Sequence, residues 1–226
     1  MVSILQLFEF SYLNGFLFYD RSGILSRRLQ ELLPGLSLKT SSLDQRDFVS
    51  RTEEIDLLFG IALSGIQTLL PDNHGFASTA TKFLQIVSES LEITQLKDFR
   101  FRYVLGKPCK SEQEAQDLMA PLIPEDAKAK MRALTGLPNW SAVQGEFQYG
   151  NLSWQSRTAI VYLIPHEKVR SAELKSGTEI PHLTVQLEAR GIAPIELAKF
   201  DAEAFINNVR ENYSREIISK LSPHLA

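Results

Sequence analysis

Two arginines on one side of a predicted strand are the side chains of this chain best suited to bind a charged partner. Arg100 and Arg102 alternate with aromatic residues over 99–105, and Lys97 and Lys107 stand near the two ends of that strand. Guanidinium groups form strong hydrogen bonds with phosphate and carboxylate oxygens. The row could therefore contact the phosphates of a nucleotide or RNA, or a carboxylate on a partner. A polar outer sheet face crossed by salt bridges predicts the same residues.

A second candidate is His182, which opens the tripeptide His182-Leu183-Thr184 on another predicted strand. The H-x-T sequence resembles half of the signature of the two-histidine phosphoesterases. Those enzymes need a second copy, but His166 is followed by Glu167-Lys168. We therefore expect His182 to lie at the mouth of a strand, as a binding residue. None of the four histidines has another at the spacing of a metal-binding pair, so we expect no metal and no cofactor.

Carboxylates and the cysteine offer weaker candidates. Glu53, Glu54 and Asp56 flank a predicted strand, and converging carboxylates could hold Mg²⁺. Leu58 continues the face that Glu54 and Asp56 share, which favours a solvated strand end. Cys109 has lysines close by in the sequence, and nearby cations lower the pKa of a thiol. No histidine base is adjacent, so we interpret the cysteine as incidental and expect no catalytic residue.

The bulk composition is that of an ordinary globular protein of 226 residues, with 44% hydrophobic and 23% charged residues. The net charge of −3 gives no global attraction to nucleic acid or anionic lipid. A single cysteine excludes an intrachain disulfide and fits a reducing cytoplasm. The apolar first residues contain Glu9 and Asn14 and have no basic region before them, which predicts a buried strand rather than a leader. No apolar stretch reaches about 20 residues, so we expect no membrane association.

The most regular pattern is a long β-hairpin over 141–164. Apolar and polar residues alternate up to Tyr149, and Gly150-Asn151 then supplies a two-residue turn. A strand with a period of two and one polar side belongs to an antiparallel sheet that meets water on that side. Trp154 shares a face with Ile160, which indicates a core position for this tryptophan.

Similar patterns predict the remaining elements. Strands are expected over 4–12, 36–42, 47–51, 54–63, 66–70, 99–105 and 182–190, with a turn at Ser64-Gly65. Helices are expected over 22–33, 78–91, 111–121, 124–134 and 201–221. Ser78 and Asp201 are predicted N-caps, and Ser111 with Glu114 forms a capping box.

These elements predict an α+β fold, with mostly antiparallel sheet(s), helices packed on one face and a long C-terminal helix. We expect residues 1–226 to form a single compact unit. Two sub-halves that meet near 107–125 are the alternative, although no residue-level repeat relates them.

Three segments are similar to a sporadically distributed bacterial family of about this length that lacks an assigned activity. They are Leu5-Gln6-Leu7-Phe8-Glu9-Phe10, Phe101-Arg102-Tyr103-Val104 and Phe200-Asp201-Ala202-Glu203-Ala204-Phe205. The middle strand of that family reads L-R-Y-[IV]-N-R, whereas Leu105-Gly106 stands here in place of the Asn-Arg. The resemblance implies a bacterial α+β protein of a defence-type complex.

A chain without a recognisable catalytic set, but with exposed strand edges and aromatic faces, is typical of a binding protein. We therefore expect a non-enzymatic binding or assembly protein that contacts a protein partner or associates with itself. The predicted contact residues are Arg100, Arg102, Trp140, Trp154 and His182. The alternative is a nucleotide- or RNA-binding protein, or a phosphate-ester hydrolase, that uses the Arg100/Arg102 strand.

Overall fold

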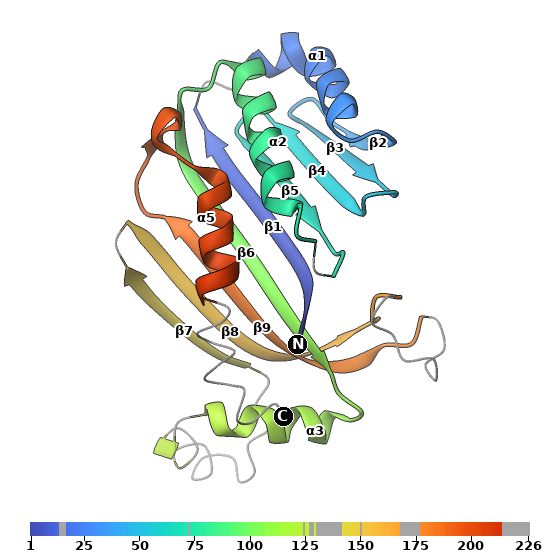
Figure 1. The fold of residues 1–226 in the computed structure, drawn as a ribbon, viewed down its shortest axis with the longest axis vertical. Helices are drawn as coiled ribbons and strands as arrows, with labels where there is room; N and C mark the ends of the chain where they lie inside the picture. Colours follow the sequence, from blue (N-terminus) through green and yellow to red (C-terminus); the bar gives the residue numbers. More distant parts are fainter. Residues whose placement is uncertain are drawn as a thin grey trace.

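The computed structural model of the chain shows one large antiparallel sheet with helices packed against it (Figure 1). The structure describes residues 1–13, 17–71, 73–123, 125–126, 129, 142–149, 151–167 and 177–213. Within these ranges the strands lie in the order β2-β3-β4-β5-β1-β6-β9-β8-β7, and the short β10 pairs with β6. Both of the sub-halves considered above contribute strands to this sheet.

The strands and helices have the following bounds. The strands are β1 (Val2–Tyr12), β2 (Leu36–Ser41), β3 (Gln45–Ser50), β4 (Ile55–Gly60), β5 (Leu63–Thr68), β6 (Gln95–Pro108), β7 (Ala142–Tyr149), β8 (Leu152–Leu163), β9 (Ile180–Gly191) and β10 (Ile195–Glu196). The helices are α1 (Leu17–Leu32), α2 (Phe76–Leu91), α3 (Glu112–Met119) and α5 (Ala202–Asn208), and a π-helical turn follows α5 over Val209–Tyr213.

An aromatic core lies between the sheet and α1, α2 and α5, which cover the same face of the sheet (Figure 1). Phe10 of β1 packs edge-on against Phe83 of α2, with ring centroids 5.8 Å apart. Phe101 of β6 lies 6.1 Å from Phe76, the first residue of α2. All four rings are almost completely buried. Burial of this aromatic area, the main favourable term in folding, holds the helices on this face.

The strand period of two separates this core from the opposite face of the sheet, which we call the open face. In the pairing of β1 with β6, Phe8 is opposite Phe101, and Glu9 is opposite Arg100. Residues directly opposite each other in antiparallel strands point to the same side. The aromatic pair therefore faces the helices, and the charged pair lies on the open face.

Helix α3 covers the other end of the core face, where it packs on β8 and β9. A second apolar cluster joins Cys109, Ala115, Met119 and Leu183. The Ser111 side chain accepts a hydrogen bond from the Glu114 backbone N–H, as the capping pattern predicts. The Glu114 carboxylate turns back to the backbone N–H of Lys110 rather than to that of Ser111.

The α+β class and the antiparallel sheet are confirmed, and so is the long hairpin, in which Tyr149 is paired with Leu152. The predicted turn at Ser64-Gly65 is wrong, because both residues lie inside β5 and the chain turns at residues 61–62. Ser64 instead bonds to the buried Tyr12 hydroxyl, and Gly65 leaves room for the Glu9 side chain. The glycine that suggested a turn is thus needed because the Glu9 side chain packs closely against its backbone.

Two predicted helix starts differ from the structure. Helix α1 begins at Leu17 rather than Ser22, because Phe18 packs against Phe59 of β4. Helix α2 begins at Phe76, so Ser78 lies inside its first turn. The long C-terminal helix is not shown. Asp201 caps α5 as predicted, but α5 ends at Asn208, and residues after 213 lie outside the described part of the chain.

The predicted helix over 124–134 also falls mostly on residues that the structure does not describe. Within the described residues, no helix has the length and apolar character that crossing a membrane requires.

Two glycines test the packing of this fold. A Cβ on Gly191 would lie 2.4 Å from Phe99, whose ring packs 4.4 Å from that of Phe200. We expect Gly191→Ala to lower the free energy of unfolding by about 1–3 kcal/mol, because overpacking forces the Phe99 ring to move.

Gly23 of α1 has nothing within 4 Å of an added Cβ, so Gly23→Ala should raise the free energy of unfolding by about 0.5–1 kcal/mol. Urea unfolding of both variants measures the two signs, and a stable Gly191→Ala protein would contradict the packing.

Candidate functional site

The open face has a charged end and an apolar end, which follow from the strand registers. One row across β1, β6 and β9 contains Leu7, Arg102 and Glu188. Two residues further along the strands, the row across β1, β6, β9 and β8 contains Leu5, Val104, Gln186 and Arg157. Charged side chains therefore give way to apolar ones along the central strands β1 and β6.

Arg100 and Arg102 belong to a charged ladder with Glu9 and Glu188. Arg100 Nε donates to Glu9 Oε2 at 2.6 Å, and Arg102 Nε donates to Glu188 Oε2 at 2.8 Å. Glu188 also lies 4.0 Å from Arg100. The hydrogen bond that Arg100 donates to Glu9 is the main reason why the pKa of Arg100 is raised above its ordinary value, with burial opposing it. Both guanidinium groups are thus already engaged by carboxylates on neighbouring strands.

A similar pair extends the ladder at its outer end. Arg190 of β9 forms two hydrogen bonds with Asp98 of β6, at 2.5 and 3.0 Å. Three arginines therefore meet three carboxylates on this part of the sheet, so the charges cancel locally. Such a surface attracts a phosphate much less than three unpaired arginines would.

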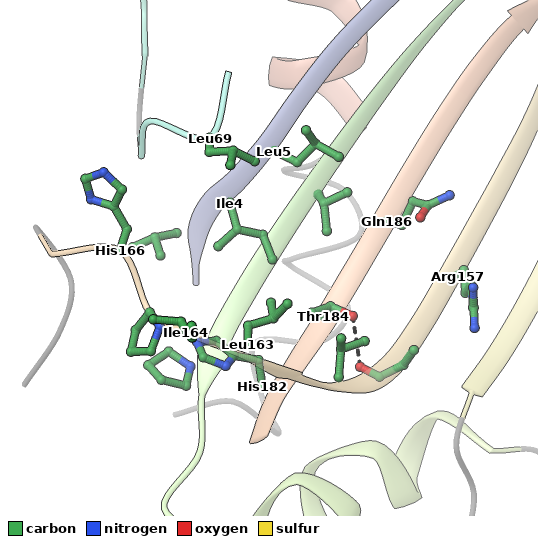
Figure 2. Close-up of a pocket in the computed structure, with 16 residues that line it drawn as sticks. Ile4, Leu5, Leu69, Arg157, Leu163, Ile164, His166, His182, Thr184 and Gln186 are labelled. Carbon is green, nitrogen blue, oxygen red and sulfur yellow. Dashed lines mark hydrogen bonds between the residues drawn. The ribbon is translucent and has the colours of Figure 1, made fainter. Parts of the chain in front are cut away.

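The apolar end of the open face is hollowed into a groove of about 400 Å³, which we call the apolar groove (Figure 2). This volume lies within the usual range for ligand pockets. Its apolar lining consists of Val2, Ile4, Leu5, Leu69, Val104, Pro108, Ala159, Val161, Leu163, Ile164 and Pro165. Leu69, Val161 and Ile164 on its rim are 55%, 37% and 56% exposed. Exposed apolar side chains that adjoin a groove mark a contact surface more strongly than scattered ones do.

A bulge and a glycine shape the floor of the groove. The β1–β6 register shifts between Ser3 and Leu5, which leaves Ile4 as the extra residue in β1. A Cβ on Gly106 of β6 would lie 3.1 Å from the Ile4 side chain. Bulges bend a strand and re-aim its side chains. Ile4 thus packs over Gly106 as part of the floor.

The segment that follows β8 borders one end of the groove. His166 Nε2 lies 2.6 Å from Glu54 Oε2, between residues 112 positions apart. Glu54 has a φ of 50°, in the left-handed region that a non-glycine residue seldom adopts. Its carbonyl accepts a hydrogen bond from the Thr68 hydroxyl at 3.0 Å. The contacts of Thr68 and His166 hold this turn in place beside Leu69.

Polar side chains complete the groove. His182 is 3% exposed, and its Nδ1 lies 2.9 Å from the Ile180 carbonyl oxygen. The Thr184 hydroxyl donates to the Ala159 carbonyl at 3.0 Å. Arg157 is exposed at the opposite end from His166 and Leu69, as Figure 2 shows. Within the described residues, Arg157 has neither an ion pair nor a side-chain hydrogen bond.

The structure separates the four predicted contact residues that it describes. Arg100 and Arg102 lie in the charged ladder, and His182 lies in the apolar groove. Trp154 is 2% exposed and belongs to the aromatic core, so it is not available for a contact. Trp140 lies outside the described residues.

The acidic candidates do not form a metal site in the part of the chain that is described. Asp56 accepts a hydrogen bond from Gln67 at 3.1 Å, whereas Glu54 is bonded to His166. No group of three or more His, Cys, Asp or Glu side chains comes together there with the placement that a metal ion needs.

Sequence reasoning missed the groove residues on β8. Arg157, Ala159 and Val161 lie on the face opposite Trp154, which we expected to be the polar side of the hairpin. The signal was present in the outward positions Ala159, Val161 and Leu163, which turn apolar towards the end of the strand. These apolar positions could be assigned to a groove only once the strand order placed β8 two strands away from Val104 of β6.

Comparison with known proteins does not assign the site. The chain matches no family model and no curated protein. The resemblance to a sporadic bacterial family therefore stays a prediction.

The charged ladder gives one prediction about stability. The Glu188 side chain is 13% exposed and serves both arginines, so Glu188→Gln should lower the free energy of unfolding by about 1 kcal/mol. The loss should shrink in 1 M NaCl, because the Arg100 and Arg102 side chains are 37% and 30% exposed and salt screens exposed charges. Glu31→Gln on the exposed side of α1 is the matched control, and urea unfolding at two salt concentrations is the measurement. Equal stability of both variants would show that the ladder contributes nothing.

Cys109 gives a second prediction. Burial raises the pKa of its thiol, and the cluster with Met119 and Leu183 covers it. A raised pKa leaves less thiolate at pH 8, and the thiolate is the reactive form. We expect the folded protein to react with a chromogenic disulfide reagent at least tenfold more slowly than the urea-unfolded protein does. Equal rates would show that the thiol is accessible.

Proposed function

We propose that this chain is a non-enzymatic binding protein that acts through protein–protein contacts, and that its contact site is the apolar groove. The observation that supports this most directly is the combination of the hollow with an exposed apolar rim. Leu69 and Val161 lie on opposite sides of the groove and are both accessible. Burying such side chains against a partner would remove their apolar area from water, at about 25 cal/mol per Å².

The shape of the site favours a protein partner over a small ligand. Small-molecule pockets usually enclose most of the ligand surface. The groove runs across β8, β9, β6 and β1, and its rim is exposed, so a bound molecule would remain in contact with water on one side. Apolar side chains that project from a partner suit such a surface, because the rest of the partner covers the rim.

The chemistry of the groove also supports binding. His182 directs Nδ1 towards a backbone carbonyl, and His166 is engaged by Glu54. Cys109 belongs to the cluster on the face that α3 covers. These potential acid, base and nucleophile groups are thus held in separate structural contacts.

The alternative of a nucleotide- or RNA-binding protein rests on the Arg100/Arg102 strand. Glu9 and Glu188 neutralise that strand, which weakens this alternative. Membership of a defence-type complex is implied by the family resemblance alone.

Rim substitutions test the proposed function. Random peptides displayed on phage would be selected on the wild-type protein and remeasured by fluorescence polarisation. We expect Val161→Glu and Leu69→Glu each to weaken binding at least tenfold, or about 1.4 kcal/mol, because a charge would be buried in the contact. Ile24→Glu is the matched control, since Ile24 is 61% exposed on α1, far from the groove.

The outcome is decisive in both directions. Peptides that bind the wild type and the Ile24→Glu control equally, and lose affinity for both rim variants, support the proposal. Failure to select any peptide, or peptides insensitive to both rim variants, would overturn it. Native mass spectrometry adds the case of self-association: a dimer that the rim variants abolish would identify a second copy as the partner.

A further inference from the structure

We infer that the apolar groove binds the C-terminal tail of its partner protein, with the terminal carboxylate on Arg157 and the last apolar side chains in the groove. This inference rests on the proposed function and specifies the chemistry that the site recognises. Its basis is the juxtaposition of a neighbouring apolar groove of limited length with a guanidinium group that has no carboxylate partner in the described part of the chain.

Arg157 differs from the other arginines of the sheet's open face. Arg100, Arg102 and Arg190 each have a carboxylate within 2.8 Å. Arg157 has no such partner among the described residues, although it lies on the same face. Its cross-strand neighbours are Gln186 on β9 and Gln144 on β7, which carry no charge. The positive charge of Arg157 is therefore available to an anion from outside.

The side chains around Arg157 suit a carboxylate. A guanidinium group can donate two parallel hydrogen bonds to the two oxygens of one carboxylate. Gln186 also lines the groove, and its amide can donate a further hydrogen bond. Arg157 is the only arginine or lysine among the described residues that line the groove, so one negative charge on the ligand matches it.

The length of the groove suits a short peptide tail. Its lining runs from β8 across β9 and β6 to β1, which is three strand spacings, or about 14 Å. An extended peptide covers this distance with about four residues. No described residue of β7 lines the groove, so the lining ends at Arg157. A chain that ends at this point places its carboxylate beside Arg157, whereas a chain that continued would leave the apolar lining there.

The opposite end offers the entry. Leu69 is 55% exposed, and the Glu54–His166 contact lies beside it. Figure 2 shows Leu69 and His166 at one end of the groove and Arg157 at the other. A tail would pass over Leu69 and place its apolar side chains against Leu5, Val104 and Ala159, all of which line the groove. The apolar floor excludes charged residues from the last few positions of the tail.

The test uses two peptide libraries on the full-length protein. One library displays random peptides with free C-termini, and the other displays the same peptides as internal loops. We expect only the first to be enriched, with apolar residues in its last three or four positions. A synthetic version of the best peptide would then be measured as the free acid and as the C-terminal amide. We expect the amide to bind about ten- to a hundredfold more weakly, as loss of a charge-assisted contact predicts.

Substitutions at Arg157 link the carboxylate to this side chain. Arg157→Gln should weaken binding of the acid by the same factor and make acid and amide bind equally, whereas Arg157→Lys should keep part of the difference. Arg27→Gln is the matched control, because Arg27 is an exposed cation on α1, which covers the opposite face of the sheet. It should leave the ratio of acid to amide unchanged.

The possible outcomes separate failure of the C-terminal assignment from failure of the proposed function. Enrichment of internal loops that depend on Val161, or equal binding of acid and amide to the wild type, overturns the C-terminal assignment and leaves the proposed function standing. Failure of both libraries overturns the proposed function as well. Decanoate is the probe for a fatty acid. If it displaces the peptide, binds more tightly than any peptide and depends on Arg157, the proposal of a C-terminal tail is overturned in favour of a fatty acid ligand.

Discussion

The pairing of β1 with β6 is the interaction on which the rest of the structure depends. Phe8 lies opposite Phe101, and Glu9 lies opposite Arg100. A shift of β1 by one residue against β6 would turn Glu9 into the core and Phe8 into water, and it would leave Arg100 on the open face without this carboxylate. The aromatic contacts on one face and the ion pair on the other therefore favour the same register. A glutamate without its arginine would be costly to bury, so the alternative register is strongly disfavoured.

The same pairing joins the two parts of the sheet. Strand β1 also pairs with β5, the last strand of the β2–β5 meander, while β6 pairs with β9 and so leads to β8 and β7. The bulge at Ile4 lies in this central ladder, at the place where the open face changes from charged to apolar. Ile4 can pack over Gly106 because that residue has no side chain. The floor of the apolar groove thus follows from the bulge near the end of the β1–β6 pairing.

Much of the fold could be predicted because its causes are local. The hairpin over 141–164 follows from alternation and a two-residue turn, and the caps at Ser111 and Asp201 follow from side-chain hydrogen bonds within four residues. The errors occurred where a distant residue overrides the local signal. Gly65 indicates a turn by itself, but in β5 it makes room for Glu9 of β1. Ser64 also indicates a turn by itself, but in β5 its hydroxyl is hydrogen-bonded to the Tyr12 hydroxyl.

The candidate site could be predicted only in part. The alternation of β6 placed Arg100 and Arg102 on one side, but it could not show that Glu9 and Glu188 neutralise them. His182 was selected for its motif and lies in the groove for a different reason, its place beside Val161 in the β8–β9 register. Trp154 shows the limit of composition as a guide, since a residue type common at interfaces is buried here in the core.

The sequence by itself determined the α+β class, the antiparallel hairpin and which side chains of each strand share a face, because backbone geometry alone sets the period of two. The tertiary structure decided which faces meet. Strand order brings Leu5, Val104 and Arg157 into one row and places His166 against Glu54, 112 residues away. Such neighbours leave no local trace in the chain, since their contact energy is gained only after the whole sheet has formed.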